Sequence, residues 1–186
     1  MIINRSRRIA LLVSMAILCS GCGKKDPVPE LVSQLSEKKA KTRRDAARSL
    51  ATLGPNAKDA VTPLLTSLRD EDFRVRAAAA QALGKIGPQA KNAVPDLLVA
   101  LKDNSARVRA LAAQSLGKVG AEAGDVVPAL IASLGDADPK VRFFAAMSIG
   151  HFGSEAKEAV PNLKNALNDR DQEVRDAAAI ALRKVN

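Results

Sequence analysis

Very few residues in this sequence are of the types that enzymes and metal sites need. The chain of 186 residues has one histidine, His151, and two cysteines, Cys19 and Cys22. A structural zinc site takes four Cys or His ligands, and a nucleophilic centre pairs a Ser, Thr or Cys with a base. Because His151 stands alone and both cysteines lie near the N-terminus, we predict no metal, no cofactor and no catalytic site. We therefore expect that the protein is not an enzyme.

Cys22 is the residue whose surroundings indicate a chemical modification. Arginines near the start precede the uncharged run 9–18, and the small residues Ser20 and Gly21 stand directly before Cys22. A positive start, a short apolar run and small residues at its end are typical of an export signal. The apolar run is too short to cross a bilayer as a helix, which takes about 20 residues.

The segment Leu18-Cys19-Ser20-Gly21-Cys22 resembles the lipobox of bacterial lipoproteins. Cys19 departs from that pattern, which usually has Leu three places before the modified cysteine. The resemblance implies a signal peptide over 1–21, lipid attachment to Cys22, a short tether over 22–27 and an exported, membrane-anchored protein of the cell envelope. A plain secretory signal or an uncut anchor is the alternative.

The remaining sequence repeats every 33 residues without an insertion. Apolar residues recur at positions 1, 4, 5 and 8 of each repeat and at positions 15, 19, 22, 23 and 26, which is helical spacing. A helix pair with one apolar face buries that face only against stacked neighbours. We therefore predict an all-α, right-handed solenoid of five helical hairpins over 28–186, numbered here as repeats 1 to 5: 28–60, 61–93, 94–126, 127–159 and 160–186.

Capping residues mark the expected helix ends in each repeat. Asp and Ser residues are favoured N-caps, and Gly adopts the positive φ that often ends a helix. We expect the second helices to start at Asp72, Ser105, Asp138 and Asp171 and to end at Gly54, Gly87, Gly120 and Gly153. The starts of the first helices are marked by Asp59, Asn92, Asp125 and Glu158.

The motif V-P-x-L-L-x-x-L, followed by D, then V-R-x-x-A-A, then L-G-x-x-G over 94–120, resembles the short HEAT-like repeat of phycobilin lyases. The resemblance covers 28–186. It implies a superhelix. Because such repeats serve many roles, the resemblance gives little information about function. We expect a non-catalytic scaffold or adaptor whose partner is another protein. A phycobilin-lyase-like or other enzyme-associated subunit that handles a small molecule is the alternative.

An arginine at position 16 of every repeat follows an acidic residue at position 10. One interpretation is a row of anion-binding arginines. The other is structural: each arginine bridges acids of its own or a neighbouring repeat, as the Asp–Arg ladder known from HEAT repeats implies. The arginines are Arg43, Arg76, Arg109, Arg142 and Arg175, and the acids are Glu37, Asp70, Asp103, Asp136 and Asp169.

Basic residues exceed acidic ones by nine over the whole chain, and the excess gathers at the N-terminal end. A solvated end repeat explains such charges, since a terminal repeat needs a polar outer face. The alternative is contact with anionic lipid beside the anchor. We do not expect nucleic acid, because the four aromatic residues are all Phe and stacking platforms for bases are few. The residues of the membrane-contact hypothesis are Lys24, Lys25, Lys38, Lys39 and Lys41.

Repeat 4 carries large apolar residues where the other repeats have small or polar ones. Phe143 and Met147 are expected opposite the buried stripe of their helix, with Phe144 and His151 beside them. Aromatic and Met residues are enriched in protein interfaces. These four residues form a predicted partner site, and the alternative is that Phe143 and Met147 pack against adjacent repeats as additional core.

Overall fold

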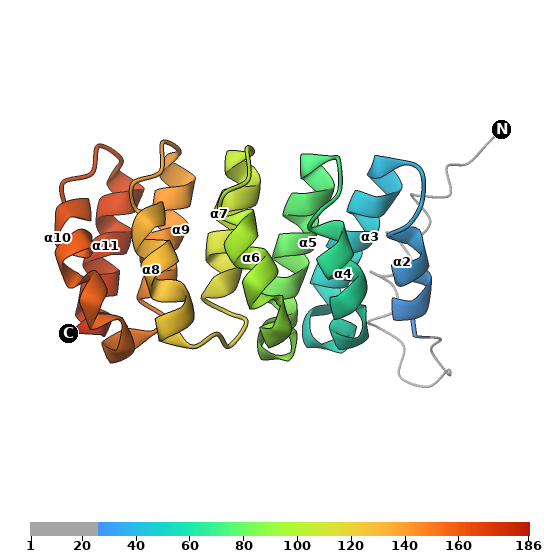
Figure 1. Cartoon of the computed structure of the whole chain (residues 1–186), viewed down its shortest axis with the longest axis horizontal. Coiled ribbons are helices and arrows are strands. Elements are labelled where there is room, and N and C mark those ends of the chain that lie inside the picture. Colours follow the sequence, from blue (N-terminus) through green and yellow to red (C-terminus); the bar gives the residue numbers. More distant parts are fainter. Residues whose placement is uncertain (1–25) are drawn as a thin grey trace, which may run out of the picture.

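Residues 26–186 form five antiparallel helical hairpins in a computed structural model of the chain, and no strand occurs in this range (Figure 1). The first helices are α2 (Val28–Gln34), α4 (Val61–Ser67), α6 (Val94–Ala100), α8 (Ala123–Ser133) and α10 (Val160–Ala166). The second helices are α3 (Ala40–Leu53), α5 (Phe73–Ile86), α7 (Ala106–Leu116), α9 (Pro139–Ile149) and α11 (Gln172–Val185). Short 3-10 helices, η1 (Gly54–Ala60), η2 (Gly87–Ala93) and η3 (Gly153–Ala159), join three of the hairpins to the next. The predicted all-α solenoid is confirmed.

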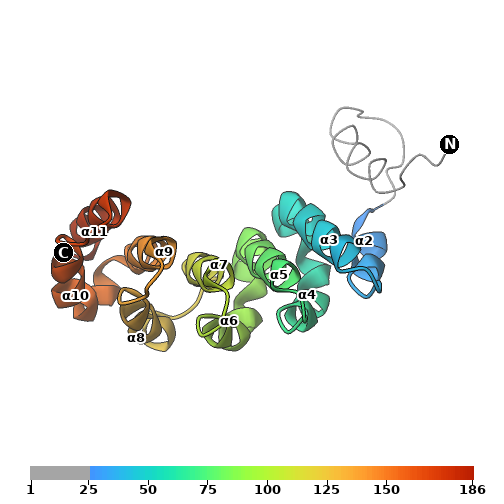
Figure 2. The same ribbon diagram turned by 90° about the horizontal axis from the view of Figure 1, so that it is seen from above.

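The hairpins stand side by side in two layers that bend into a shallow arc (Figure 2). The second helices, α3 through α11, lie on the inner side of the arc and the first helices on the outer side. Neighbouring second helices contact one another along the whole row. Small residues at these contacts let the inner helices approach closely, and the row bends toward them.

Close packing between second helices depends on a serine facing a glycine in the preceding repeat. The Ser115 hydroxyl donates to the main-chain oxygen of Ala80 at 2.7 Å, and the Ser148 hydroxyl donates to that of Ala113 at 2.8 Å. A Cβ atom on Gly117 would lie 2.7 Å from the Ser148 hydroxyl oxygen, closer than real Cβ atoms approach. Gly117 is therefore glycine because another helix occupies the space of its side chain.

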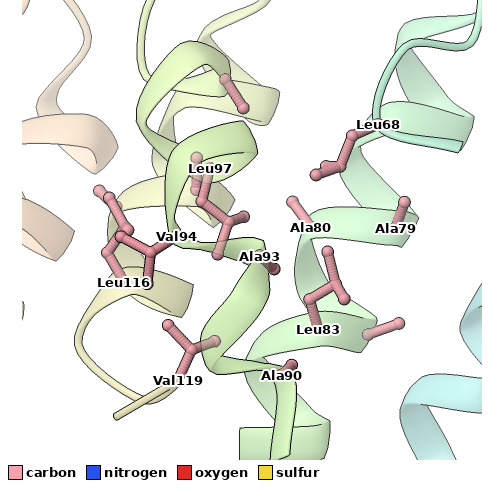
Figure 3. Packing of buried hydrophobic residues seen from close by; sticks show 14 of the residues in the cluster. Leu68, Ala79, Ala80, Leu83, Ala90, Ala93, Val94, Leu97, Leu116 and Val119 are labelled. Atoms are coloured by element: carbon pink, nitrogen blue, oxygen red, sulfur yellow. The ribbon is translucent and has the colours of Figure 1, made fainter. Parts of the chain in front are cut away.

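The core runs across the borders between repeats without a break. In Figure 3, Leu83 of α5, Leu97 of α6 and Leu116 of α7 lie in one apolar layer, and all three are fully buried. Each first helix thus rests on its own second helix and on the neighbouring repeat. Burial of Leu and Val at fixed positions of every repeat supplies the main stabilising term.

The second helices begin where the sequence predicts. The side chains of Asp72 and Asp138 accept main-chain N–H groups of Arg74 and Lys140, and Asp171 accepts two such groups at the start of α11. Ser105 precedes α7 without a side-chain bond to the helix.

The four predicted capping glycines have positive φ, between 54° and 78°. α3 and α5 end directly before Gly54 and Gly87, whereas α7 and α9 end at Leu116 and Ile149, before Gly120 and Gly153 are reached.

The predicted starts of the first helices are wrong. Asp59, Asn92 and Glu158 lie inside η1, η2 and η3, which run directly into the following helices. Because no extended residue separates the two, no N-cap is needed there. In repeat 4 the helix α8 instead begins earlier, after the extended residue Glu122, so Asp125 falls in its first turn.

Candidate binding surface

Four of the five position-16 arginines form a ladder of ion pairs between repeats. Arg109 donates from Nε and a terminal nitrogen to the Asp136 carboxylate at 2.7 and 2.8 Å. Its other terminal nitrogen donates to the main-chain oxygens of Asp103 and Asn104 in its own repeat. The same arrangement joins Arg43 to Asp70, Arg76 to Asp103 and Arg142 to Asp169. Each arginine therefore bridges its own interhelical loop to the aspartate of the next repeat.

The aspartates of the ladder are mostly buried and fully occupied. The Asp136 side chain is 13% exposed, and it also accepts the main-chain N–H of Asp138 at 2.9 Å. Hydrogen bonds from Arg109 and Arg142 hold the pKa of Asp136 and Asp169 below the usual range of an aspartate. Burial alone would raise the pKa of Asp70 and Asp103, but their arginine and main-chain hydrogen bonds outweigh it.

The two ends of the ladder differ from its middle. Glu37 takes part only through its main-chain oxygen, which accepts from Arg43 at 2.9 Å. Arg175 donates to the main-chain oxygen of Asp169 and to the side chain of Gln172. In the four complete pairs the donors of the guanidinium groups are directed at protein oxygens, so this geometry favours the structural interpretation over an anion-binding row.

The inner surface is formed by residues at positions 14, 21 and 25 of each repeat, which lie on the second helix or directly after its end, on the side turned away from the first helix. Most of these side chains are exposed and the others are half-buried. Position 14 carries Lys41, Arg74, Arg107, Lys140 and Glu173; position 21 carries Arg48, Gln81, Gln114, Met147 and Ile180; position 25 carries Thr52, Lys85, Lys118, His151 and Lys184. Because the second helices stand side by side in the inner layer (Figure 2), the residues at each of these positions form a column that crosses the repeats.

The predicted partner site of repeat 4 lies on this inner surface. Phe143, Phe144 and Met147 are half-buried and pack against the core, so they are neither an open patch nor fully internal. The Phe143 and Phe144 rings meet edge to face with centroids 5.1 Å apart. The structure places these side chains between the two alternatives drawn from the sequence: part of each side chain supports the fold, and part faces solvent.

His151 is exposed beside this cluster and stands in a basic column. Partial burial lowers its pKa, and the charges of Lys184 and Lys118 lower it further. Among residues 26–186 no carboxylate is paired with His151, so no acceptor is placed to activate it as a general base.

Three lysines of the membrane-contact hypothesis lie within the described residues, and two lie outside them. Lys38, Lys39 and Lys41 are exposed and lie at the α2–α3 loop and the start of α3. The chain enters α2 at the opposite end of the hairpin (Figure 1). The seven residues of α2 put about 10 Å between the two ends. Lys24, Lys25 and Cys22 lie outside the described residues.

A hollow of about 480 Å³ opens on the outer layer between repeats 2 and 3. Four of its charged residues are paired with one another: Arg69 with Asp96 at 2.8 Å, and Arg76 with Asp103 at 2.6 Å. The exposed side chain of Val99 lies beside them. Lys102 also lines the hollow and forms none of these ion pairs, so a single cation is left there to contact a small molecule.

Within residues 26–186, no group of three or more His, Cys, Asp or Glu side chains is arranged to hold a metal ion. No helix in the same range is long and apolar enough to cross a membrane.

The basic columns at positions 14 and 25 were missed by the sequence analysis. The net charge of a whole repeat conceals them, because basic and acidic residues are close to balance in repeats 3 to 5. The signal was present, since Lys85, Lys118 and Lys184 are spaced by multiples of 33 residues. The basic columns can be recognised only when the residues that face inward are separated from those that form the ladder.

The family described as HEAT repeats matches residues 28–117 and 127–186. No curated protein matches the chain. Among solved structures, the chain is similar to the complex of CpcE and CpcF of phycocyanin lyase from Nostoc sp. PCC7120, with 26% identity, a TM-score of 0.76, and coverage of 91% of this chain and 68% of that one. It is also similar to a designed armadillo repeat protein in complex with the peptide (KR)4, with 18% identity, a TM-score of 0.74, and coverage of 97% and 91%. An engineered protein is similar at 22% identity and a TM-score of 0.69, with coverage of 98% and 84%.

Proposed function

The chain belongs to the HEAT-repeat family, and on that premise we propose that it is a non-catalytic scaffold that binds another protein on the inner surface of its solenoid. The observation that carries the proposal is the pair of side-chain columns at positions 14 and 25, which present basic side chains across repeats 2 to 4 on either side of position 21. A surface built this way matches an elongated partner better than a compact small molecule.

Two of the structural neighbours support this use of the fold. One is a designed repeat protein in complex with a peptide, and another is a complex of two subunits, CpcE and CpcF. The side chains of this chain also favour binding over catalysis, because His151 lacks a carboxylate partner and the ladder arginines are paired with aspartates.

Site-specific photocrosslinking in cells tests the proposal. A crosslinking amino acid at Gln114 or Met147 reports on the inner surface, and the same residue at Val99, which is 73% exposed on the outer layer, is the control. We expect one specific protein adduct from the two inner positions and none from Val99. Adducts formed equally from all three positions, or from Val99 alone, would exclude the inner surface as the binding face.

We further propose that lipid on Cys22 tethers the scaffold to a membrane of the cell envelope. The tripartite N-terminal pattern that ends in Ser20-Gly21-Cys22 supports this. A single acyl chain binds a membrane only marginally, whereas two or more hold it stably. Cys22→Ser should move the protein from the membrane to the soluble fraction or leave it unprocessed. A mature N-terminus found free and unmodified beyond residue 22 would refute the tether.

A role as a subunit that handles a small molecule is the second candidate, and the similarity to CpcE and CpcF of phycocyanin lyase is the observation in its favour. Native mass spectrometry of the protein purified from its own cells separates the two. A bound small molecule at equal stoichiometry supports the second candidate, and a mass equal to that of the processed chain supports the scaffold.

A further inference from the structure

The inner surface of repeats 2 to 4 carries cations and no acidic side chain. None of these three repeats has Asp or Glu at positions 14, 21 and 25, or at positions 17 and 18 between them. Acidic residues return at the two ends of the solenoid: Asp45 in repeat 1, and Glu173 and Asp176 in repeat 5. The cations of the central stretch are Arg74, Lys85, Arg107, Lys118 and Lys140.

These cations are not neutralised by the protein itself. Among residues 26–186, Arg107 and Lys140 of one column and Lys85 and Lys118 of the other form no ion pair. Arg74 reaches only Asp72, at 3.7 Å, and lies over the Phe73 ring. Partial burial lowers the pKa of Lys118, and repulsion from Lys85 lowers it further. Like charges thus face one another one repeat apart, and the free energy of this arrangement falls when an anion binds between them.

The strip between the two basic columns is polar and apolar but uncharged. Eleven residues separate positions 14 and 25, so the columns run about 16 Å apart. Gln81 and Gln114 lie between them and are half-buried, as are Leu111, Phe144 and Met147. A glutamine amide offers one acceptor and two N–H donors, which match the N–H and C=O groups of an extended main chain.

We propose that the inner surface of repeats 2 to 4 binds an extended, acidic segment of the partner protein. The inference rests on the proposed function and gives its partner a chemistry. The main chain of the segment lies along the glutamines, and its carboxylates reach the columns on either side. Neighbouring helices stand about 8–10 Å apart, which two to three residues of an extended strand span.

A polypeptide matches this surface better than a nucleic acid does. Binding of single strands relies on aromatic side chains on which successive bases stack. At positions 17, 18 and 21 of repeats 2 and 3 the residues are Ala, Gln and Leu, and the one exposed aromatic ring beside them, Phe73, is covered by the Arg74 guanidinium. The apolar side chains of Phe144 and Met147 instead accommodate one or two apolar residues of a peptide.

Fluorescence anisotropy with the full chain tests the proposal. The probe is a fluorescein-labelled peptide of about nine residues, the length of an extended strand that crosses three repeats. Pairs of Glu alternate with single Leu residues, so that carboxylates point to both sides of the strand. The inner variant is Lys85→Glu with Arg107→Glu, and both of these residues are exposed. The control is Lys102→Glu with Lys157→Glu, which changes the net charge equally at exposed sites away from the inner surface.

We expect salt-dependent binding that the inner variant weakens at least about tenfold and the control leaves within about twofold. Equal losses in both variants, or none in either, would overturn the proposal. A second variant, Gln81→Ala with Gln114→Ala, should weaken binding without changing its salt dependence, because it removes main-chain partners and no charge.

Two further results separate the possible failures. Tighter binding of a thymidine oligonucleotide of equal charge would replace the acidic peptide by a nucleic acid. If the inner crosslinks to a partner persist while the acidic peptide does not bind, the chemistry assigned to the partner is wrong and the scaffold function stands. Loss of both refutes the scaffold function itself.

Discussion

Replacing Asp136 by Asn should destabilise the solenoid far more than breaking an exposed ion pair does. The Asp136 carboxylate accepts from Arg109 at 2.7 and 2.8 Å and from the main-chain N–H of Asp138 at 2.9 Å. Asn has the same shape, but its NH₂ group would face a guanidinium donor, so one of the two arginine bonds is lost. The other is weakened, because the amide oxygen that accepts it has no negative charge.

The magnitude follows from the burial of the pair. The side chains of Arg109 and Asp136 are 18% and 13% exposed, so water replaces the lost acceptor poorly. A hydrogen bond to a charged group contributes about 1.5–3 kcal/mol, and leaving a buried charge without its partner costs about 3–5 kcal/mol. For this partly exposed pair we expect a loss of about 2–3 kcal/mol in the free energy of unfolding.

Urea unfolding followed by circular dichroism at neutral pH measures this loss. The matched control is Glu122→Gln, because the Lys91–Glu122 pair has a distance of 2.6 Å but both side chains are well exposed, so no measurable change is expected. The slope of the transition should be reported with the midpoint, since repeat arrays can unfold in parts. Equal midpoints for Asp136→Asn and Glu122→Gln would refute the view that the ladder stabilises the stacking of repeats.

Three further predictions test the packing, the electrostatics and the apolar cluster. Gly117→Ala should lower the free energy of unfolding by about 1–3 kcal/mol, because the added methyl group overpacks against Ser148. Gly124→Ala, which has open space around its Cβ, should be neutral or slightly stabilising. Equal effects of the two variants in thermal melts would contradict the close approach of the helices at Gly117. The folded pKa of Asp136 is lowered, so its contribution to stability is complete above the ordinary value of 3.8 and is lost as pH falls through the lowered pKa. The urea midpoint should therefore be steady between pH 7 and 5 and fall below about pH 4. A midpoint that holds down to pH 3 would contradict this contribution of Asp136. Phe143→Ala with Met147→Ala should lower the free energy of unfolding by about 2 kcal/mol, less than the 3–5 kcal/mol that one fully buried Phe contributes, because both side chains are half-buried. The folded double variant should also form fewer crosslinks from the inner surface. A loss above about 5 kcal/mol would assign both side chains to the core.

Local sequence signals were sufficient for the helices and for several of their ends. Asp72, Asp138 and Asp171 cap second helices through bonds to residues two or three places on, so the sequence around them contains all the atoms involved. The starts of the first helices were predicted wrongly for a related reason. Asp59 and Asn92 are good N-caps by residue type, but each lies within a 3-10 helix that continues into the α-helix, and that continuation depends on packing beneath the preceding repeat.

The residues of the ladder were likewise identified from the sequence, which left open whether each arginine binds acids of its own repeat or of a neighbouring one. The 33-residue period marks Arg109 and Asp103, six residues apart, as a recurring pair. In the structure Arg109 instead binds the carboxylate of Asp136, 27 residues further along the chain, and takes only a main-chain oxygen from Asp103. Which aspartate an arginine reaches depends on the distance and angle between stacked hairpins, and no local pattern contains those quantities.

Hydrophobic periodicity and capping act over a few neighbouring residues, so the amino-acid pattern is sufficient to predict a row of five helical hairpins with one buried stripe per helix. The distribution of charges over the surface follows instead from how the hairpins stack. Stacking brings the acids of the ladder against arginines at the edge of the solenoid and leaves Lys85, Arg107 and Lys140 unpaired on the inner surface. Repeats that are nearly neutral in sequence thus form a positively charged face, because stacking neutralises one set of charges and exposes the other.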